Sequence, residues 1–331
     1  MTHQTRNVAE FLVSCLEAEG VEYVFGIPGE ENIKFVRAIT ASEKIRFILV
    51  RHEQAASFMA DIYGRLTGKA GVCTATLGPG AINLLLGTAD AQTDSSPLVA
   101  ISAQVGLNRI YKESHQIVDL TAMFRPVTQW AETIFTPQSS AEMVRKAFRI
   151  AQQERPGATY LAVPQDVEAM PVPADLHPLS PVKSHLSAPY SQTISAAAAI
   201  LRDSRFPVIL AGHGVARQNA SAALNQFVEQ FQIPTATTFM GKGVISDRST
   251  HSLGVMGFMR HDYENFAFDQ ADVILAVGYE LQEFAPERMN PGGDKRIIHI
   301  NSFLPDTDSH YSTEVSVIAD ISMSLQALSE A

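Results

Sequence analysis

The feature that most constrains the fold of this sequence is a regular alternation of helix-like segments with short apolar runs rich in β-branched residues. Residues 6–19 place apolar side chains at helical spacing, and the run 21–26 then predicts a strand. Such alternation is typical of a parallel sheet whose strands are joined by crossover helices. We therefore expect an α/β protein.

The same pattern covers both halves of the sequence. In the first half it predicts a helix that begins near Glu53 and a separate helix over 81–90. It also predicts strands over 46–50, 70–76, 96–102 and 158–163. After residue 190 it predicts helices over 191–203, 218–231 and 322–329, and strands over 207–212, 233–238, 272–278 and 296–300. Each half thus has the elements of a mostly parallel sheet flanked by helices.

A proline-rich stretch separates the two halves. Five prolines, at positions 171, 173, 178, 181 and 189, lie where neither a helical nor an alternating pattern is present. Prolines at this density favour an extended linker. We expect a first domain over 1–168, a linker over 169–190 and a second, Rossmann-like domain over 191–331.

Composition narrows the class of protein. With 331 residues, the chain is longer than one ordinary hydrophobic core supports. A net charge of −10 and no basic run argue against nucleic acid, and no apolar run approaches the length of a membrane span. Cys15 and Cys73 lie in apolar contexts, which predicts buried thiols, and residues 1–7 have no signal-peptide pattern. We expect a cytoplasmic protein.

The sharpest local feature is Glu53, a carboxylate at the junction between an apolar strand and the following helix. By itself it could merely favour the positive end of the helix dipole. Two further strand-to-helix turns, over 26–32 and 76–83, carry glycine and proline. Because ligands bind at the carboxyl ends of strands in open α/β sheets, three such turns predict a shared site.

Four segments of the first half carry a resemblance to a known family. They are VFGIPG, RHEQAA, TLGPGAINLLLGTADAQTDSSPLVAIS and KESHQIVDLTAMFRPVTQW. They resemble the pyrimidine-binding domain of acetolactate synthase large subunits, which are thiamine-diphosphate-dependent enzymes. AGHGVA, PTATTFMGKGVIS, LGVMGF and ADVILAVGYE resemble the central domain of the same family. The resemblance therefore covers essentially the whole chain.

The resemblance implies a reaction and a role for each matching residue. Glu53 would hydrogen-bond N1′ of the cofactor's aminopyrimidine and promote loss of the thiazolium proton, which needs a carboxyl group in a shielded site. Pyruvate would lose carbon dioxide and join a second 2-keto acid. Glu53 and Gln116 would be catalytic. The cofactor would contact Gly29, Glu53, Thr76, Gly78, Pro79, Gly80 and Asn83, and the substrate would contact Gly29, His115 and Gln116.

Two of these assignments have alternatives. His115 and Gln116 could simply form a polar loop, and many biosynthetic members have an aromatic residue where His115 stands. The pair Glu30-Glu31 departs from the small or differently charged residues that often follow the glycine matching Gly29. This departure leaves the exact keto acid open.

The resemblance leaves FAD open but less favoured. Leu253 to Gly257 resembles the stretch that approaches FAD in flavin-containing members, and Gly212-His213-Gly214 could lie near its phosphates. By contrast, Gly278 to Pro286 resembles members that hold no flavin.

The sequence contains no Gly-Asp-Gly, the motif with which the family's third domain holds the magnesium that bridges the cofactor's diphosphate. We therefore expect magnesium only through a missing domain and an isolated chain that is inactive. A homodimer, or a partner chain that supplies this domain, would complete the site. The alternatives are a noncatalytic homologue that pairs with a complete subunit, and another thiamine-diphosphate decarboxylase or oxidase.

Overall fold

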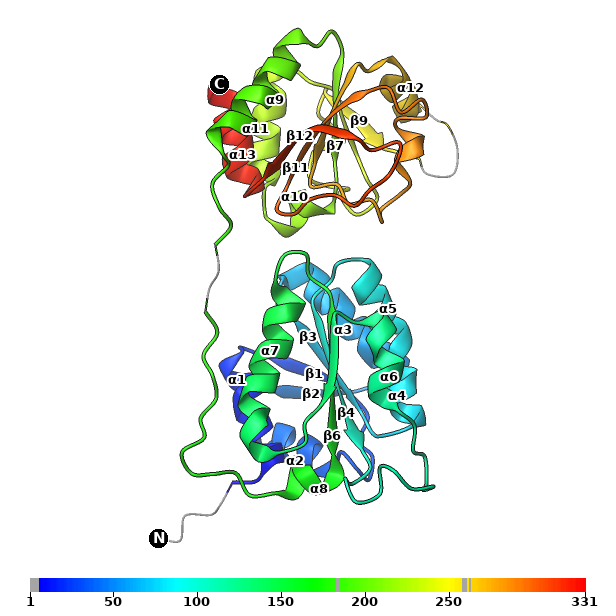
Figure 1. The fold of residues 1–331 in the computed structure, drawn as a ribbon, viewed down its shortest axis with the longest axis vertical. Helices are drawn as coiled ribbons and strands as arrows, with labels where there is room; N and C mark the ends of the chain where they lie inside the picture. The colour runs from blue at the N-terminus through cyan, green and yellow to red at the C-terminus, as the bar shows by residue number, and fades with distance from the viewer. Residues whose placement is uncertain (1–5, 183–184, 258–260, 262) are drawn as a thin grey trace. The chain divides into compact units, whose positions relative to one another are not determined.

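The computed structural model describes residues 6–182, 185–257, 261 and 263–331 (Figure 1). The expectations for positions 1–5, for 183–184 of the linker and for Phe258 lie outside the described residues. Two compact units are present, residues 1–183 and 184–331. In the described part of the chain, no helix combines the length and the apolar character that a membrane span requires.

The first unit is built on a six-stranded, entirely parallel sheet in the order β2-β1-β3-β4-β6-β5. The strands are β1 (Tyr23–Gly26), β2 (Arg46–Leu49), β3 (Gly71–Ala75), β4 (Leu98–Gln104), β5 (Trp130–Thr133) and β6 (Ala158–Pro164). Every residue of β3, β4 and β6 is buried, because helices cover both faces of the sheet.

Two cores lie on opposite faces of this sheet (Figure 1). One is formed with α1 (Val8–Ala18), α2 (Ile33–Ala41), α7 (Ser140–Gln152) and α8 (Gln165–Ala169). The other is formed with α3 (Glu53–Thr67), α4 (Pro79–Asn83), α5 (Leu85–Thr93) and α6 (Leu120–Phe124). Two short 3₁₀ helices, Arg125–Val127 and Pro137–Ser139, lie before β5 and α7.

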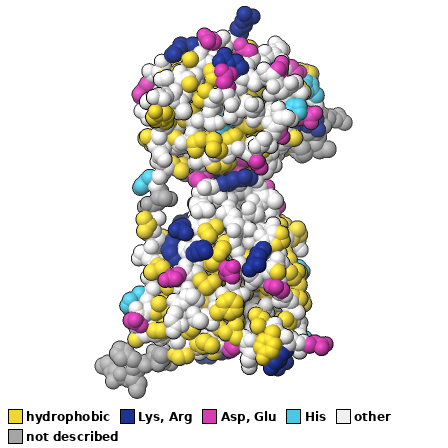
Figure 2. Space-filling view, in the orientation of Figure 1, with side chains coloured by type: hydrophobic (Ala, Val, Ile, Leu, Met, Phe, Trp, Pro, Cys, Tyr) yellow, Lys and Arg dark blue, Asp and Glu magenta, His cyan; other side chains and the backbone are white. Residues whose placement is uncertain are grey.

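The second unit repeats this architecture with the order β12-β11-β10-β7-β8-β9, again with parallel pairing throughout. Its strands are β7 (Pro207–Ala211), β8 (Thr235–Thr237), β9 (Ser252–Val255), β10 (Val273–Val277), β11 (Arg296–Asn301) and β12 (Thr313–Ile318). Its helices are α9 (Ser191–Asp203), α10 (His213–Arg217), α11 (Ser221–Phe231), α12 (Tyr263–Gln270), α13 (Ile321–Glu330) and the 3₁₀ helix Pro286–Arg288. On the face drawn in Figure 2, Lys and Arg side chains of both units are scattered among acidic and apolar ones.

The α/β class predicted from the alternating pattern is confirmed by these two parallel sheets. Some elements differ from the prediction. The helix expected over 81–90 is divided into α4 and α5, which meet at Leu84, and the helix expected over 218–231 begins at Ser221. Strands β5, β9 and β12 and helices α2, α6, α7, α8, α10 and α12 were not predicted. The three strands are short or form sheet edges, where a half-exposed strand carries a weaker apolar signal.

The proline-rich stretch begins as part of the first unit. Asn7 forms a bridge with Pro171, and the backbone N–H of Val172 donates to the carbonyl of Arg6 at 2.9 Å. The Val172 side chain is buried in the core beside α1. These contacts attach the start of the stretch to the amino-terminal end of the described chain.

Candidate functional site

Three strand-to-helix turns meet at one edge of the first sheet. Strand β1 lies between β2 and β3 and pairs with both in parallel. The turns that follow these strands, over 27–32, 50–52 and 76–78, therefore leave the same carboxyl edge of the sheet. These turns contain Gly29 and Gly78, while Glu53 and Gly80 lie at the start of the helices that follow.

The first and third turns are in close contact at Gly29 and Thr76. A Cβ atom on Gly29 would lie 2.5 Å from the Cβ and 2.6 Å from the Oγ1 of Thr76, so only glycine fits there. The Thr76 hydroxyl donates to Oε2 of Glu31 at 2.6 Å. The backbone N–H of Gly29 donates to Oδ1 of the buried Asn32 at 2.6 Å. These bonds fix the turn after β1 against the turn after β3.

Glu53 lies at the start of α3, where His52 caps the helix by accepting a hydrogen bond from the N–H of Gln54 at 3.1 Å. The Glu53 side chain is half-buried. Its Oε2 accepts a hydrogen bond from Nδ2 of Asn83, at the end of α4, at 3.0 Å. The fold thus joins two residues that are 30 positions apart in the chain.

Gly80 packs closely against this carboxylate. A Cβ atom on Gly80 would lie 3.3 Å from Oε1 of Glu53 and 2.8 Å from Cγ2 of Thr76. Within the described residues, Oε1 of Glu53 has no hydrogen-bond partner. The carboxylate therefore keeps one oxygen that a ligand could bind.

Gln116 lies against the same turn. Gly78 adopts a φ of +54°, and a Cβ atom there would lie 2.5 Å from the carbonyl oxygen of Gln116. Gln116 has a φ of +56° and is exposed, as are its neighbour His115 and Pro79. The backbone of Gln116 thus lies against the turn that contains Gly78, and His115 lies in the same exposed loop as Gln116.

The geometry fits the pyrimidine half of thiamine diphosphate. A carboxylate with an available oxygen can share a proton with a ring nitrogen, as the aminopyrimidine requires. Among the described residues, no cluster of three or more His, Cys, Asp or Glu side chains could hold a metal ion.

One residue of this site was missed by sequence reasoning. Glu31, treated only as a departure from the family pattern, is the hydrogen-bond acceptor for Thr76. The available signal was its position two residues after Gly29, inside a turn already assigned to the site.

Two family models match separate parts of the chain. One, described as the thiamine pyrophosphate enzyme N-terminal TPP binding domain, matches residues 6–123, and the other, the thiamine pyrophosphate enzyme central domain, matches residues 194–328. The chain belongs to the thiamine pyrophosphate (thiamine diphosphate) enzymes, and it carries these two domains of the family.

Within that family the chain is similar to acetolactate synthases. It is 35% identical over 326 residues to a probable acetolactate synthase large subunit of Methanococcus aeolicus, a match covering 97% of this chain and 54% of the relative. It is 35% identical over 314 residues to acetolactate synthase of Bacillus subtilis, covering 95% and 55%. It is 34% identical over 323 residues to the catabolic acetolactate synthase of Raoultella terrigena, covering 97% and 57%. The chain spans about half the length of the curated relatives it matches.

Proposed function

We propose that this chain forms the pyrimidine-binding part of an acetolactate synthase, which decarboxylates pyruvate and joins the product to a second 2-keto acid. The observation that carries the proposal is the Glu53 carboxylate, whose Oε2 is held by Asn83 while its Oε1 has no hydrogen-bond partner among the described residues. The similarity to acetolactate synthases supports the choice of reaction.

Thiamine diphosphate, when bound, supplies the electron sink that decarboxylation needs. The chain's own residues would prepare it. Glu53 would hold a proton at the aminopyrimidine nitrogen with Oε1, while Asn83 keeps Oε2 in place. Gly78 and Gly80 would border the ring with their backbone, and Gln116, which lies against Gly78, would face the keto acid from the adjacent loop.

The remaining contacts follow from the same edge of the sheet. Gly29 and Thr76, held by Glu31, would border the ring and the substrate. Pro79 would keep the turn rigid, because proline fixes φ. His115, in the exposed loop beside Gln116, would contact the acceptor keto acid.

The diphosphate half of the cofactor needs groups beyond those described above. We propose that a further domain, in a longer form of this chain or in a partner chain, holds the diphosphate with magnesium. The sequence contains no Gly-Asp-Gly, and the chain spans about half of its relatives. A homodimer in which each chain faces a partner's diphosphate domain is the proposed assembly.

The test is acetolactate formation from pyruvate, with thiamine diphosphate and magnesium, by the full chain alone and with a separately expressed diphosphate-binding domain from a relative. Glu53→Gln keeps the shape of the side chain but removes its charge. Glu43→Gln makes the same change at an exposed position in the turn before β2, at the opposite edge of the sheet, and is the matched control.

We expect activity in the mixture, its loss in Glu53→Gln and its retention in Glu43→Gln. Removal of a group that transfers a proton costs about 10²- to 10⁴-fold in rate. Equal activity of Glu53→Gln and wild type would refute the assignment of Glu53. Absence of acetolactate in every mixture, with a partner subunit captured from the native cell, would favour the noncatalytic homologue.

A further inference from the structure

The second sheet contains a point where its strand order reverses. Strands β7 and β10 are neighbours, and the chain passes from β7 outward to β8 and β9 but from β10 outward to β11 and β12. In open α/β sheets a dinucleotide binds in the crevice beyond the carboxyl ends of the two strands at such a point. Here that position holds the turn at Gly212 with the first residues of α10, over 212–214, and the loop 278–283.

In this chain the two loops close against each other. The N–H of Gly212 donates to the carbonyl of Val277, and the N–H of Gly214 donates to the carbonyl of Gly278, both at 2.8 Å. A Cβ atom on Gly212 would lie 2.5 Å from the carbonyl oxygen of Gly278 and 2.5 Å from Oε1 of Glu283. The glycines therefore serve loop-to-loop packing, and the crevice between the strands is filled by protein atoms.

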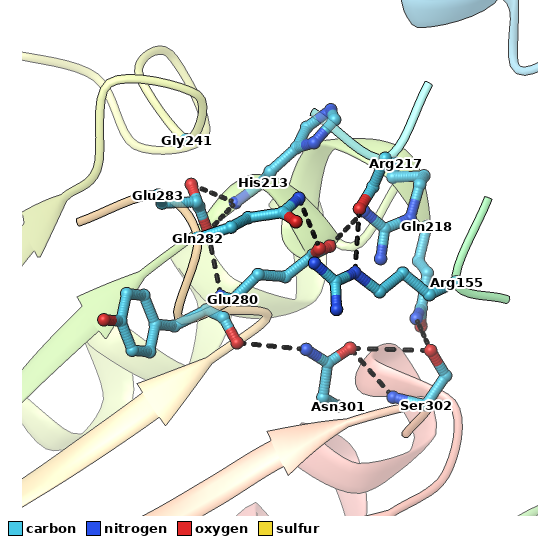
Figure 3. Close-up of polar contacts among 12 residues, drawn as sticks. Arg155, His213, Arg217, Gln218, Gly241, Glu280, Gln282, Glu283, Asn301 and Ser302 are labelled. Carbon is cyan, nitrogen blue, oxygen red and sulfur yellow. Dashed lines mark hydrogen bonds and ion pairs between the residues drawn. The ribbon is translucent and has the colours of Figure 1, made fainter. Parts of the chain in front are cut away.

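The carboxylate of Glu283 accepts hydrogen bonds from backbone N–H groups of both loops (Figure 3). The N–H of His213 donates to both of its oxygens at 3.2 Å, and the N–H of Glu280 donates to Oε1 at 3.0 Å. The hydroxyl of Thr238, after β8, donates to Oε2 at 2.5 Å. Backbone N–H groups in such loops are the usual partners of nucleotide phosphates.

Arg217, a cation beside these loops, also has a paired side chain. Nη1 of Arg217, at the end of α10, lies 2.5 Å from Oε1 of Glu280, and the two side chains are only 8% and 1% exposed. Nε2 of Gln282 donates to the other oxygen of Glu280 at 3.1 Å. A phosphate group entering here would meet the carboxylates of Glu280 and Glu283, which repel it.

We propose that Glu283 fills the position that the phosphates of a dinucleotide such as FAD would need, so that the central domain of this chain takes no flavin. Burial raises the pKa of Glu283 to about 7, despite the hydrogen bonds from Thr238, Glu280 and His213 that favour its charged form. When the carboxyl group is protonated on Oε2, Oε1 still accepts the N–H bonds of His213 and Glu280. The site therefore stays closed on both sides of neutral pH.

The first test is the flavin content of the purified full chain, followed by titration with FAD. We expect no flavin absorbance in the protein, no quenching of FAD fluorescence and no rise in the melting temperature. Flavin retained through purification, or stabilisation by micromolar FAD, would overturn the proposal. The outcome does not depend on acetolactate synthase activity.

The second test addresses Glu283 itself. In Glu283→Ala, the backbone N–H groups of His213 and Glu280 lose their acceptor. Their amide hydrogen exchange, measured by NMR, should become about tenfold faster or more, as expected for loss of a hydrogen bond to a charged group. Glu287→Ala, at an exposed position of the neighbouring 3₁₀ helix, should leave both rates unchanged. Equal exchange in the two variants would refute the role of Glu283.

Discussion

Replacement of Gly78 by alanine tests the contact that holds the loop around Gln116 against the turn after β3. Gly78 combines a φ of +54° with a position where an added Cβ would lie 2.5 Å from the carbonyl oxygen and 2.9 Å from the Cβ of Gln116. Gly78→Ala therefore introduces both backbone strain and a collision with a backbone atom. Because a backbone atom cannot rotate away, the loop around Gln116 must move.

The two contributions can be separated with Gly68, the left-handed cap of α3. It has a φ of +69°, and an added Cβ there would meet no atom within 4 Å. Gly68→Ala should thus show strain alone, about 1 kcal/mol in the free energy of unfolding. Gly78→Ala should cost about 3 kcal/mol or more, since the collision adds to similar strain.

Thermal unfolding of the full chain measures the difference. For a unit of this size, 1 kcal/mol lowers the melting temperature by about 2–4 °C. We expect a decrease of about 2–4 °C for Gly68→Ala and at least twice that for Gly78→Ala. Equal decreases in the two variants would show that Gln116 does not lie against the turn, and would remove it from the proposed site.

Three further predictions concern the first unit. The guanidinium of Arg65 pairs with the buried Asp61 at 3.0 Å, so Arg65→Met should lower the free energy of unfolding by about 3 kcal/mol, because a buried carboxylate is left unpaired. Lys44→Met, which removes an exposed ion pair with Glu17, is the control and should change it much less. Similar losses in the two variants, measured by urea unfolding, would contradict this. Burial raises the pKa of both cysteine thiols, that of Cys15 to about 12, so Cys15 and Cys73 should react with a thiol reagent only after denaturation. Fast reaction in the native protein would contradict their burial. Burial also raises the pKa of Glu168 to about 8, so the contribution of this group to stability is complete below its unfolded pKa and is lost as pH rises through 8. Urea unfolding should show that Glu168 makes the protein about 3 kcal/mol less stable at pH 9 than at pH 6, and Glu168→Gln should lack this decrease. Identical pH profiles of the two proteins would refute the prediction.

The sequence by itself determined the two α/β units, the central buried strands and the turns that carry the site. These features depend on local patterns, since apolar runs of β-branched residues and helical spacing act over a few residues. Glu53 and the glycines of residues 76–83 could be predicted to lie at one edge of the sheet, because the turns after neighbouring parallel strands share an edge. The family resemblance added roles that spacing alone left open.

Only the tertiary structure decided which of these groups touch. Strand β6 lies between β4 and β5, an order that no local pattern encodes. The bonds from Thr76 to Glu31 and from Asn83 to Glu53 join separate turns, and Glu283 reaches His213 across 70 positions of the chain. Such contacts arise from the packing of whole elements, so a carboxylate that the sequence treats as a loop residue becomes the group that closes a crevice.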